Sequence, residues 1–266
     1  MKKLITTLTL FLLCFALLAG CGATTTDPTT DPTTDPTTEP TTTEPTTAAS
    51  EEVTEEVTEE VTEDSELSYY INGIYAEAIS RYYTALSAQW NEATYFENEM
   101  SPLAAYYYDG NPLDNIGFTF IDVDGDGNKE LFIGAIDNAE NDPLVLEIWT
   151  IIDDQPVMLG QSGSHNRYYL QYEAEVYNWS IAYEAENGAA NWLTCYLQIL
   201  DHELTVTQGI VFDAIADEAN PWFLTYDLDW DTTNDEPTDE DMANAILTNG
   251  RILYTAAEYI PFSALN

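Results

Sequence analysis

Four acidic residues crowd into nine positions near the middle of the chain, in the stretch FTFIDVDGDGNKELFIGAI. They are Asp122, Asp124, Asp126 and Glu130, at positions 1, 3, 5 and 9 of the motif, with Asn128 at position 7. Calcium takes about 6–8 hard oxygen ligands, and this spacing folds several carboxylates and the Asn128 backbone carbonyl onto one point. The pattern therefore predicts a calcium site. A plain Asp-Gly hairpin turn is the alternative interpretation.

The residues on either side of the loop indicate which type of calcium loop it is. An EF-hand has an acidic residue at position 12 and helices on both sides. Here position 12 is Ile133, and the flanking segments FTFI and ELFIGAI have the pattern of strands. We therefore expect a strand–loop–strand site.

The stretch from Asp122 to Leu131 resembles the DxDGDGxx(D/E)L calcium loops of the FG-GAP and VCBS repeats found in integrin-type propellers. The resemblance implies a structural Ca²⁺ whose ligands are Asp122, Asp124, Asp126, the Asn128 carbonyl and Glu130. Those loops occur in arrays, whereas this chain has one good copy, so a propeller is not expected.

A weaker copy of the same spacing occurs at Asp227, Asp229, Asp231 and Asp235. Thr232 stands where a glycine would permit the bend. We expect the preceding strand to continue here, with the aspartates facing water and Leu228 and Trp230 behind them. A second metal site is the alternative.

The elements that position these residues are predicted to form an α+β domain over residues 67–266. Apolar residues between Leu67 and Trp90 recur at spacings of three and four, which is typical of one helical face. An antiparallel meander is predicted next, from the strand-like segments 117–122, 129–136, 144–152, 155–161, 167–173, 176–184, 191–200, 203–212 and 222–228. A closing helix is expected to begin near Thr238, with Asp241 completing a capping box, and to stop before Gly250.

Charge and residue types argue against several functions. Residues 67–266 contain 34 acidic and 4 basic residues, a net charge of −30, which excludes nucleic-acid binding. Ser164 and His165 are adjacent, and neighbours on a strand point to opposite faces. His202 lies in a predicted hairpin turn, and Cys195 is expected to be a small buried hydrophobe. Among so many acids no glycosidase-like carboxylate pair can be singled out, so we assign no catalytic residue.

The first 20 residues have the shape of a secretory signal, with Lys2 and Lys3 before an apolar run. Leu18-Ala19-Gly20-Cys21 resembles the bacterial lipobox, which implies cleavage before Cys21 and a diacylglyceryl group on its thiol. An ordinary cleaved signal that releases a soluble protein is the alternative. Residues 21–66 are expected to be a disordered Thr/Pro/Glu stalk, since residues 22–66 contain no aromatic or basic residue. The domain would then project through the cell wall from the extracellular face of the cytoplasmic membrane.

The order of features resembles a loose group of uncharacterised surface lipoproteins of Gram-positive, Firmicutes-type bacteria. The matching motifs are Asp124 to Leu131, Glu147 to Thr150, Asn166 to Leu170 and Pro261 to Ser263. No activity comes with this resemblance.

We expect a lipid-anchored surface protein with a calcium-stabilised, non-catalytic binding or adhesion domain, and a glycan or a surface protein as ligand. Candidate contacts are the aromatic residues Tyr106, Tyr107, Tyr108, Trp179 and Trp230, although we expect most of them to pack in the core. The alternatives are a hydrolase acting on glycans through a carboxylate pair and a structural envelope protein without a small ligand. An exposed row of aromatics would favour glycan binding. A deep cleft with buried carboxylates would favour an enzyme, and an evenly polar surface would favour the structural role. The oligomeric state stays open.

Overall fold

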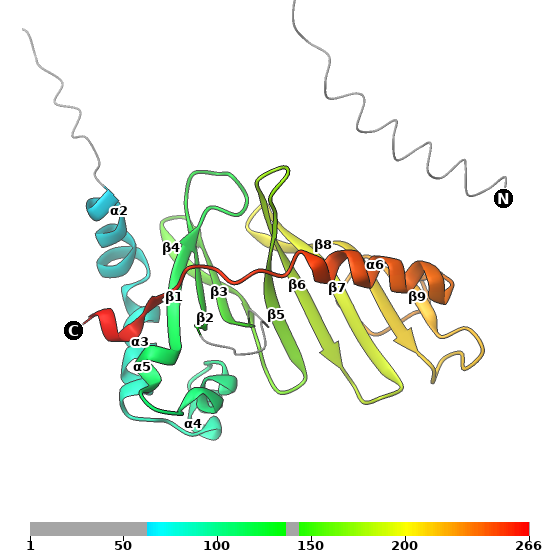
Figure 1. The fold of residues 1–266 in the computed structure, drawn as a ribbon, viewed down its shortest axis with the longest axis horizontal. Coiled ribbons are helices and arrows are strands. Elements are labelled where there is room, and N and C mark those ends of the chain that lie inside the picture. Colours follow the sequence, from blue (N-terminus) through cyan, green and yellow to red (C-terminus); the bar gives the residue numbers. More distant parts are fainter. Residues whose placement is uncertain (1–62, 137–143, 266) are drawn as a thin grey trace, which may run out of the picture. The chain divides into compact units, whose positions relative to one another are not determined.

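The computed structural model describes residues 63–136 and 144–265 (Figure 1). The predicted signal segment, Cys21 and the predicted stalk up to residue 62 lie outside the described residues, whereas residues 63–66 of that stalk are helical. Within the described ranges, no helix has both the length and the apolar character needed to span a membrane.

The first helical segment is interrupted by a π-helical turn. Helix α2 (Glu63–Tyr69) runs into the π-turn η1 (Tyr70–Ile74), and α3 (Ala76–Ser87) follows. The backbone N–H of Tyr75 donates to the Tyr70 carbonyl at 3.1 Å, which is the i to i+5 bond of a π-turn. The extra residue brings both tyrosines onto one side, where they stack on Phe120. The prediction of one continuous helix over 67–90 is therefore wrong in detail.

Three short helices between α3 and the sheet were not predicted. They are α4 (Glu92–Glu97), the 3₁₀ helix η2 (Pro102–Tyr107) and α5 (Pro112–Asn115). The side chains of Asn91 and Asn111 cap α4 and α5 by accepting backbone N–H bonds, and proline begins η2 and α5.

The rest of the described chain is dominated by one antiparallel sheet, and each predicted strand segment overlaps an observed strand. The strands are β1 (Ile116–Ile121), β2 (Glu130–Ala135), β3 (Leu144–Ile152), β4 (Gln155–Gln161), β5 (Asn166–Glu173), β6 (Asn178–Glu186), β7 (Asn191–Leu200), β8 (Glu203–Asp213), β9 (Trp222–Thr225), β10 (Glu236–Pro237) and β11 (Ile260–Pro261). Their order is β10-β9-β8-β7-β6-β5-β3-β2-β1-β11.

The sheet departs from a simple meander at two places. Strand β4 folds back on the second half of β3, so β5 pairs with the first half of β3, where Leu144 lies opposite Tyr169. At the other edge the two-residue strand β11 pairs with β1, with Ile260 opposite Phe118. The meander prediction therefore holds from β1 to β4 and from β5 to β9, and it misses the β3–β5 and β1–β11 pairings.

Alternation along the strands gives the sheet two apolar faces. Leu131 and Ile133 pack with the N-terminal helices, while Phe132 between them packs in a second core on the other face. The second core gathers residues of β5 to β8, among them Leu170, Ile181, Leu193, Cys195, Leu197 and Val211. Full burial of one such aliphatic side chain contributes about 1.5–3 kcal/mol.

The closing helix is α6 (Glu240–Ile252), which crosses strands of the sheet (Figure 1). Its cap is Asp239, whose side chain accepts the Met242 N–H at 2.8 Å. Thr238 was the predicted cap, but its backbone N–H donates to the Trp222 carbonyl. This bond continues the pairing of β9 with β10, so the helix begins later. Gly250 lies inside α6 rather than beyond its end, and a side chain is excluded there because a Cβ would overlap the ring of Tyr196. The short helix η3 (Phe262–Leu265) ends the described chain.

Candidate functional site

The predicted calcium loop connects β1 and β2, so the strand–loop–strand prediction is confirmed. Its carboxylates accept backbone N–H bonds from within the loop. Asp122 takes those of Gly125 (2.8 Å) and Gly127 (3.2 Å), and both glycines have positive φ angles, +76° and +93°. The loop curls around the first aspartate because glycine adopts this conformation without strain.

The remaining acids continue the pattern two residues apart. Asp124 accepts the Asp126 N–H at 3.1 Å, and Asp126 accepts the Asn128 N–H at 2.7 Å. The Asn128 side chain also donates to Asp126 at 3.1 Å. The Asn128 carbonyl stays a predicted ligand.

The structure brings the predicted ligands together in two overlapping groups rather than one. Carboxylate oxygens of Asp122, Asp124 and Glu130 lie within 4.8 Å of one another. A second group, within the same limit, joins Asp124 and Asp126 to His202. Asp124 belongs to both groups, so it is the centre of the candidate metal site.

His202 is a site residue that the sequence did not reveal. It lies in the tight turn between β7 and β8, where Asp201 and His202 have φ angles of +51° and +63°, so the predicted hairpin turn is confirmed. Its Nδ1 is buried and has no hydrogen-bond partner among the described residues. Only the fold places this turn against the β1–β2 loop, because some 76 residues separate Asp126 from His202 in the sequence.

The electrostatics of the loop favour a cation. Glu130 is 1% exposed and accepts the Val123 N–H and the Thr150 hydroxyl, each at 3.0 Å. Burial raises its pKa to about 7, and the charges of Asp124 and Asp126 add to the increase. Burial, with the charges of Asp126 and Asp122, also raises the Asp124 pKa. The all-oxygen donors of Asp122, Asp124 and Glu130 fit Ca²⁺ chemically, and a bound ion would offset their repulsion.

The second acidic stretch is a loop, and the prediction that its strand continues is wrong. Strand β9 ends at Thr225, and the chain returns as β10, with Glu236 opposite Leu224. Asp227, Asp229 and Asp231 each accept a backbone N–H from two residues further on. These bonds satisfy the carboxylates locally and bend the chain, which ends the strand.

The residues considered for catalysis do not converge on one site. Ser164 and His165 occupy the two-residue turn between β4 and β5, not a strand, and they line different hollows. Cys195 is fully buried on β7, and burial raises its thiol pKa to about 12. The prediction that Cys195 is a buried hydrophobe is confirmed.

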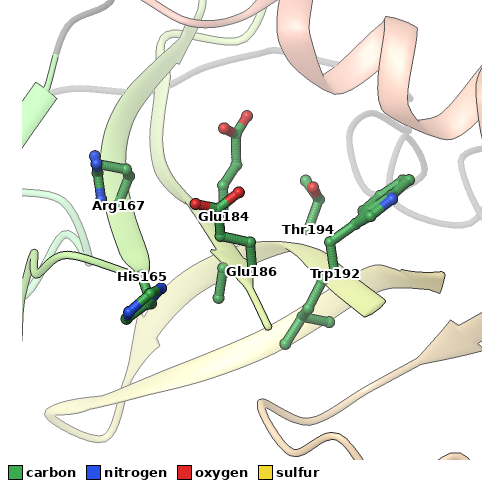
Figure 2. A pocket seen from close by; sticks show the side chains of 8 residues that line it. His165, Arg167, Glu184, Glu186, Trp192 and Thr194 are labelled. Atoms are coloured by element: carbon green, nitrogen blue, oxygen red, sulfur yellow. The ribbon is translucent and has the colours of Figure 1, made fainter. Parts of the chain in front are cut away.

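A separate groove runs over β5, β6 and β7 beside α6. Its first hollow, of about 300 Å³, is lined by polar side chains and one indole, including Arg167, Glu184, Glu186, Trp192 and Thr194 (Figure 2). A second hollow of about 430 Å³ shares Glu184 and Thr194 with the first and extends along α6. A third, of about 270 Å³, shares Arg167 and reaches the aromatic residues of η2.

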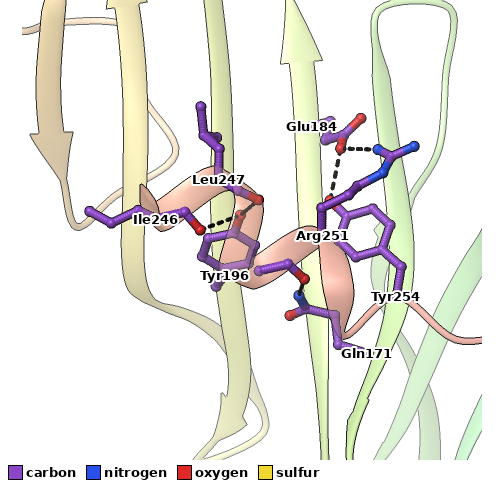
Figure 3. Close-up of polar contacts among 8 residues, drawn as sticks. Gln171, Glu184, Tyr196, Ile246, Leu247, Arg251 and Tyr254 are labelled. Carbon is purple, nitrogen blue, oxygen red and sulfur yellow. Dashed lines mark hydrogen bonds and ion pairs between the residues drawn. The ribbon is translucent and has the colours of Figure 1, made fainter. Parts of the chain in front are cut away.

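Helix α6 forms one wall of the groove through a small polar network (Figure 3). Glu184 accepts from Arg251 Nη1 at 2.7 Å and from the Tyr254 hydroxyl at 2.8 Å. Tyr196 donates to the Ile246 or Leu247 carbonyl of α6, at 3.4 and 3.3 Å. These contacts fix the helix against β6 and β7.

An aromatic row lies across the sheet next to the first hollow. Register places Trp192 of β7 opposite Phe212 of β8, and Phe212 opposite Trp222 of β9. The Trp192 and Phe212 rings are stacked, with centroids 5.4 Å apart and planes at 11°, and Trp222 meets both edge-on. All three side chains are partly exposed.

The sequence pointed to other aromatics, which have different positions. Tyr106 is 66% exposed, and with Tyr107 it lines the third hollow. Tyr108 donates to the Trp90 carbonyl, so it has a packing role. Trp179 and Trp230 pack against the second core: both are partly buried there. The Trp192 row was missed because its members come from three strands whose register is not visible in the sequence.

Comparison with family models, with curated proteins and with solved structures finds no match for this chain.

Proposed function

We propose that this chain is a lipid-anchored extracellular surface protein whose calcium-stabilised domain binds a ligand without catalysing a reaction. The observation that carries the binding role is the groove over β5–β7, with hollows that share Glu184, Thr194 and Arg167. Ligand sites are concave and combine apolar surface with a few polar groups, and this groove has both. An evenly polar surface, the mark of a purely structural role, does not describe it.

The groove is a poor candidate for carboxylate-pair hydrolysis. Glu184 is held by Arg251 and Tyr254, and Glu186 is exposed. A general acid usually lies in an enclosed apolar pocket. Glu184 is instead paired with an arginine and Glu186 faces solvent, which favours a binding role.

The calcium part of the proposal is supported by the β1–β2 loop and the raised pKa of Glu130. Bound Ca²⁺ would connect the β1–β2 loop to buried Glu130 on β2, and thereby to Thr150 on β3. Extracellular calcium modules bind at roughly 10⁻⁴–10⁻³ M. At a hundredfold excess over Kd the ion adds about 2.7 kcal/mol to stability.

Thermal unfolding of the full chain in 10 mM Ca²⁺ and in EDTA tests the calcium part of the proposal. This calcium concentration is about 100 times a Kd of roughly 10⁻⁴ M, the tighter end of the range for extracellular modules. We expect a midpoint higher by roughly 5–10 °C in calcium, since about 1 kcal/mol shifts a domain of this size by about 2–4 °C. Asp124→Asn should abolish the shift. Asp217→Asn is the matched control, because Asp217 also accepts backbone N–H bonds, from Ala219 and Asn220, far from the loop in sequence. Equal midpoints in calcium and EDTA would contradict the calcium site.

The anchor is tested separately. Expressed in a Gram-positive bacterium fed labelled palmitate, the full chain should carry the label in the membrane fraction, and Cys21→Ser should lose it. Label retained by the serine variant would contradict lipidation at this residue. The binding role is tested by adhesion of the labelled chain to whole bacterial and host cells, and no saturable adhesion would contradict it.

A further inference from the structure

We infer that the groove beside the Trp192 row takes a neutral oligosaccharide, with one sugar ring lying against the indole of Trp192. This inference rests on the proposed binding role and names the ligand class. It arises from three features that the sheet brings together: a braced aromatic surface, hydrogen-bonding groups of both kinds, and local charge balance.

Strand register places the relevant side chains on one face. Arg167 lies opposite Glu184, and Glu184 lies opposite Thr194. Two residues along, Glu186 lies opposite Trp192. Directly paired residues of antiparallel strands point to the same face, so these five side chains form one surface. Figure 2 shows them around the hollow.

The aromatic surface is held in position before any ligand arrives. Trp192 stacks on Phe212, and Trp222 packs edge-on against both rings. An indole braced in this way loses little conformational entropy on binding. The flat C–H face of a pyranose ring is apolar, and an aromatic ring is the side chain that matches it in shape and polarity.

The polar groups match hydroxyls, which both donate and accept. The Arg167 guanidinium provides donors, the Glu186 carboxylate provides acceptors and the Thr194 hydroxyl is both. Arg167 is oriented by bonds from its Nη1 to the carbonyls of Gly163 and Asn166. Donors and acceptors therefore lie within one hollow, next to the indole.

Charge argues against anionic ligands. Two of the four basic residues in 67–266, Arg167 and Arg251, line the adjoining hollows together with Glu184 and Glu186. The groove is thus balanced in a domain of net charge −30. A polyanion would be repelled by the domain. A neutral polyhydroxyl ligand meets no such penalty, and the balanced groove matches its lack of charge.

The groove contains two adjoining hollows, which favours a chain over a single sugar. The hollows of about 300 and 430 Å³ share Glu184 and Thr194, so they could hold neighbouring units of one ligand. Further rings would lie along α6, next to Tyr196 and Tyr254.

A glycan array probed with the full chain in calcium tests the inference, followed by calorimetry with the strongest soluble hit. We expect neutral oligosaccharides to bind. Trp192→Ala should weaken the hit about tenfold or more, the loss expected for one stacked ring and its buried area. Glu186→Gln should weaken it several-fold without loss of fold, because this carboxylate is exposed. Phe96→Ala removes an aromatic that is 76% exposed on α4 and should leave affinity unchanged.

Thermal unfolding of each variant in calcium first shows whether it is folded. If Trp192→Ala shows no unfolding transition, the affinities of Glu186→Gln and Thr194→Val test the inference instead. Binding confined to sialylated or uronate glycans, no glycan binding, or affinities unaffected by these groove variants would overturn the inference. If the chain still adheres to cells after periodate has destroyed their glycans, the ligand class is wrong while the proposed binding role stands. If adhesion itself is absent, the proposed function fails.

Discussion

Glu147→Gln should destabilise the domain, because this buried carboxylate is surrounded by hydrogen-bond donors. Glu147 lies on β3 and is 1% exposed. Its Oε1 accepts from the Tyr82 hydroxyl of α3 at 2.8 Å and from the Ser101 N–H before η2 at 3.1 Å. Its Oε2 accepts from Trp149 Nε1 at 3.0 Å, and Gln161 Nε2 makes a long contact of 3.4 Å with Oε1. One side chain thus fastens the N-terminal helices to the sheet.

The size of the effect follows from this geometry. A glutamine amide retains one acceptor oxygen, which can serve Tyr82 and Ser101, but its NH₂ group then faces the Trp149 N–H. A hydrogen bond to a charged group contributes roughly 1.5–3 kcal/mol, so one such bond is lost and two are weakened. Burial raises the Glu147 pKa, and removing the charge recovers part of that desolvation. We expect a net loss of about 2–3 kcal/mol.

Urea and thermal unfolding of the full chain at pH 7 in calcium measure this loss. A midpoint lower by roughly 5–10 °C is expected for a domain of this size. Glu186→Gln makes the same chemical change at an exposed position of β6 and should stay within about 0.5 kcal/mol of the wild type. If Glu147→Gln is as stable as this control, the idea that an ionised carboxylate fastens the helices to the sheet is refuted.

Three further predictions concern other contacts. Gly250→Ala should lower stability by about 1–3 kcal/mol in urea unfolding, because the new methyl group overlaps the Tyr196 ring. A rise by the roughly 1 kcal/mol of helix propensity would contradict that packing. Asp239→Ala should cost about 1 kcal/mol by removing the α6 cap, and Asp239→Asn should restore most of it; equal losses in both variants would count against capping. In EDTA, the folded chain holds the Glu130 proton more tightly than the unfolded chain, so stability should fall by up to about 3 kcal/mol as the pH rises from 4.5 to 7. Glu130→Gln should reduce this slope, and a slope unchanged by the substitution would disprove the assignment.

Much of the sheet was predictable, because the signal is local. Alternating apolar residues between Asp, Asn and Gly clusters mark β1 to β9, and the DVDGDGNKE sequence marks a tight loop. The β1–β2 loop follows from residues within one hairpin. Strand β11 has only two residues and forms because it reaches β1 from the other end of the domain, so no local pattern announces it.

The misread positions share a physical cause, which is that tertiary contacts overrode local rules. Gly250 has the residue type of a helix stop, yet it serves close packing against Tyr196. The π-turn at Tyr70–Ile74 breaks helical periodicity to place two tyrosines against Phe120. His202 reaches the β1–β2 loop only through the fold. Charge and composition cannot encode such long-range contacts.

The packing of Phe262 has a consequence for the order of folding. This residue is fully buried against Tyr82 and Phe118, with ring centroids 6.0 and 5.2 Å away. Tyr82 on α3 and Phe262 are far apart in the sequence, so the core that α3 begins stays incomplete until the segment around Phe262 reaches it. Contacts of such long range form slowly, since the intervening loop must close first. The helices before the sheet are therefore expected to reach their final packing late in folding.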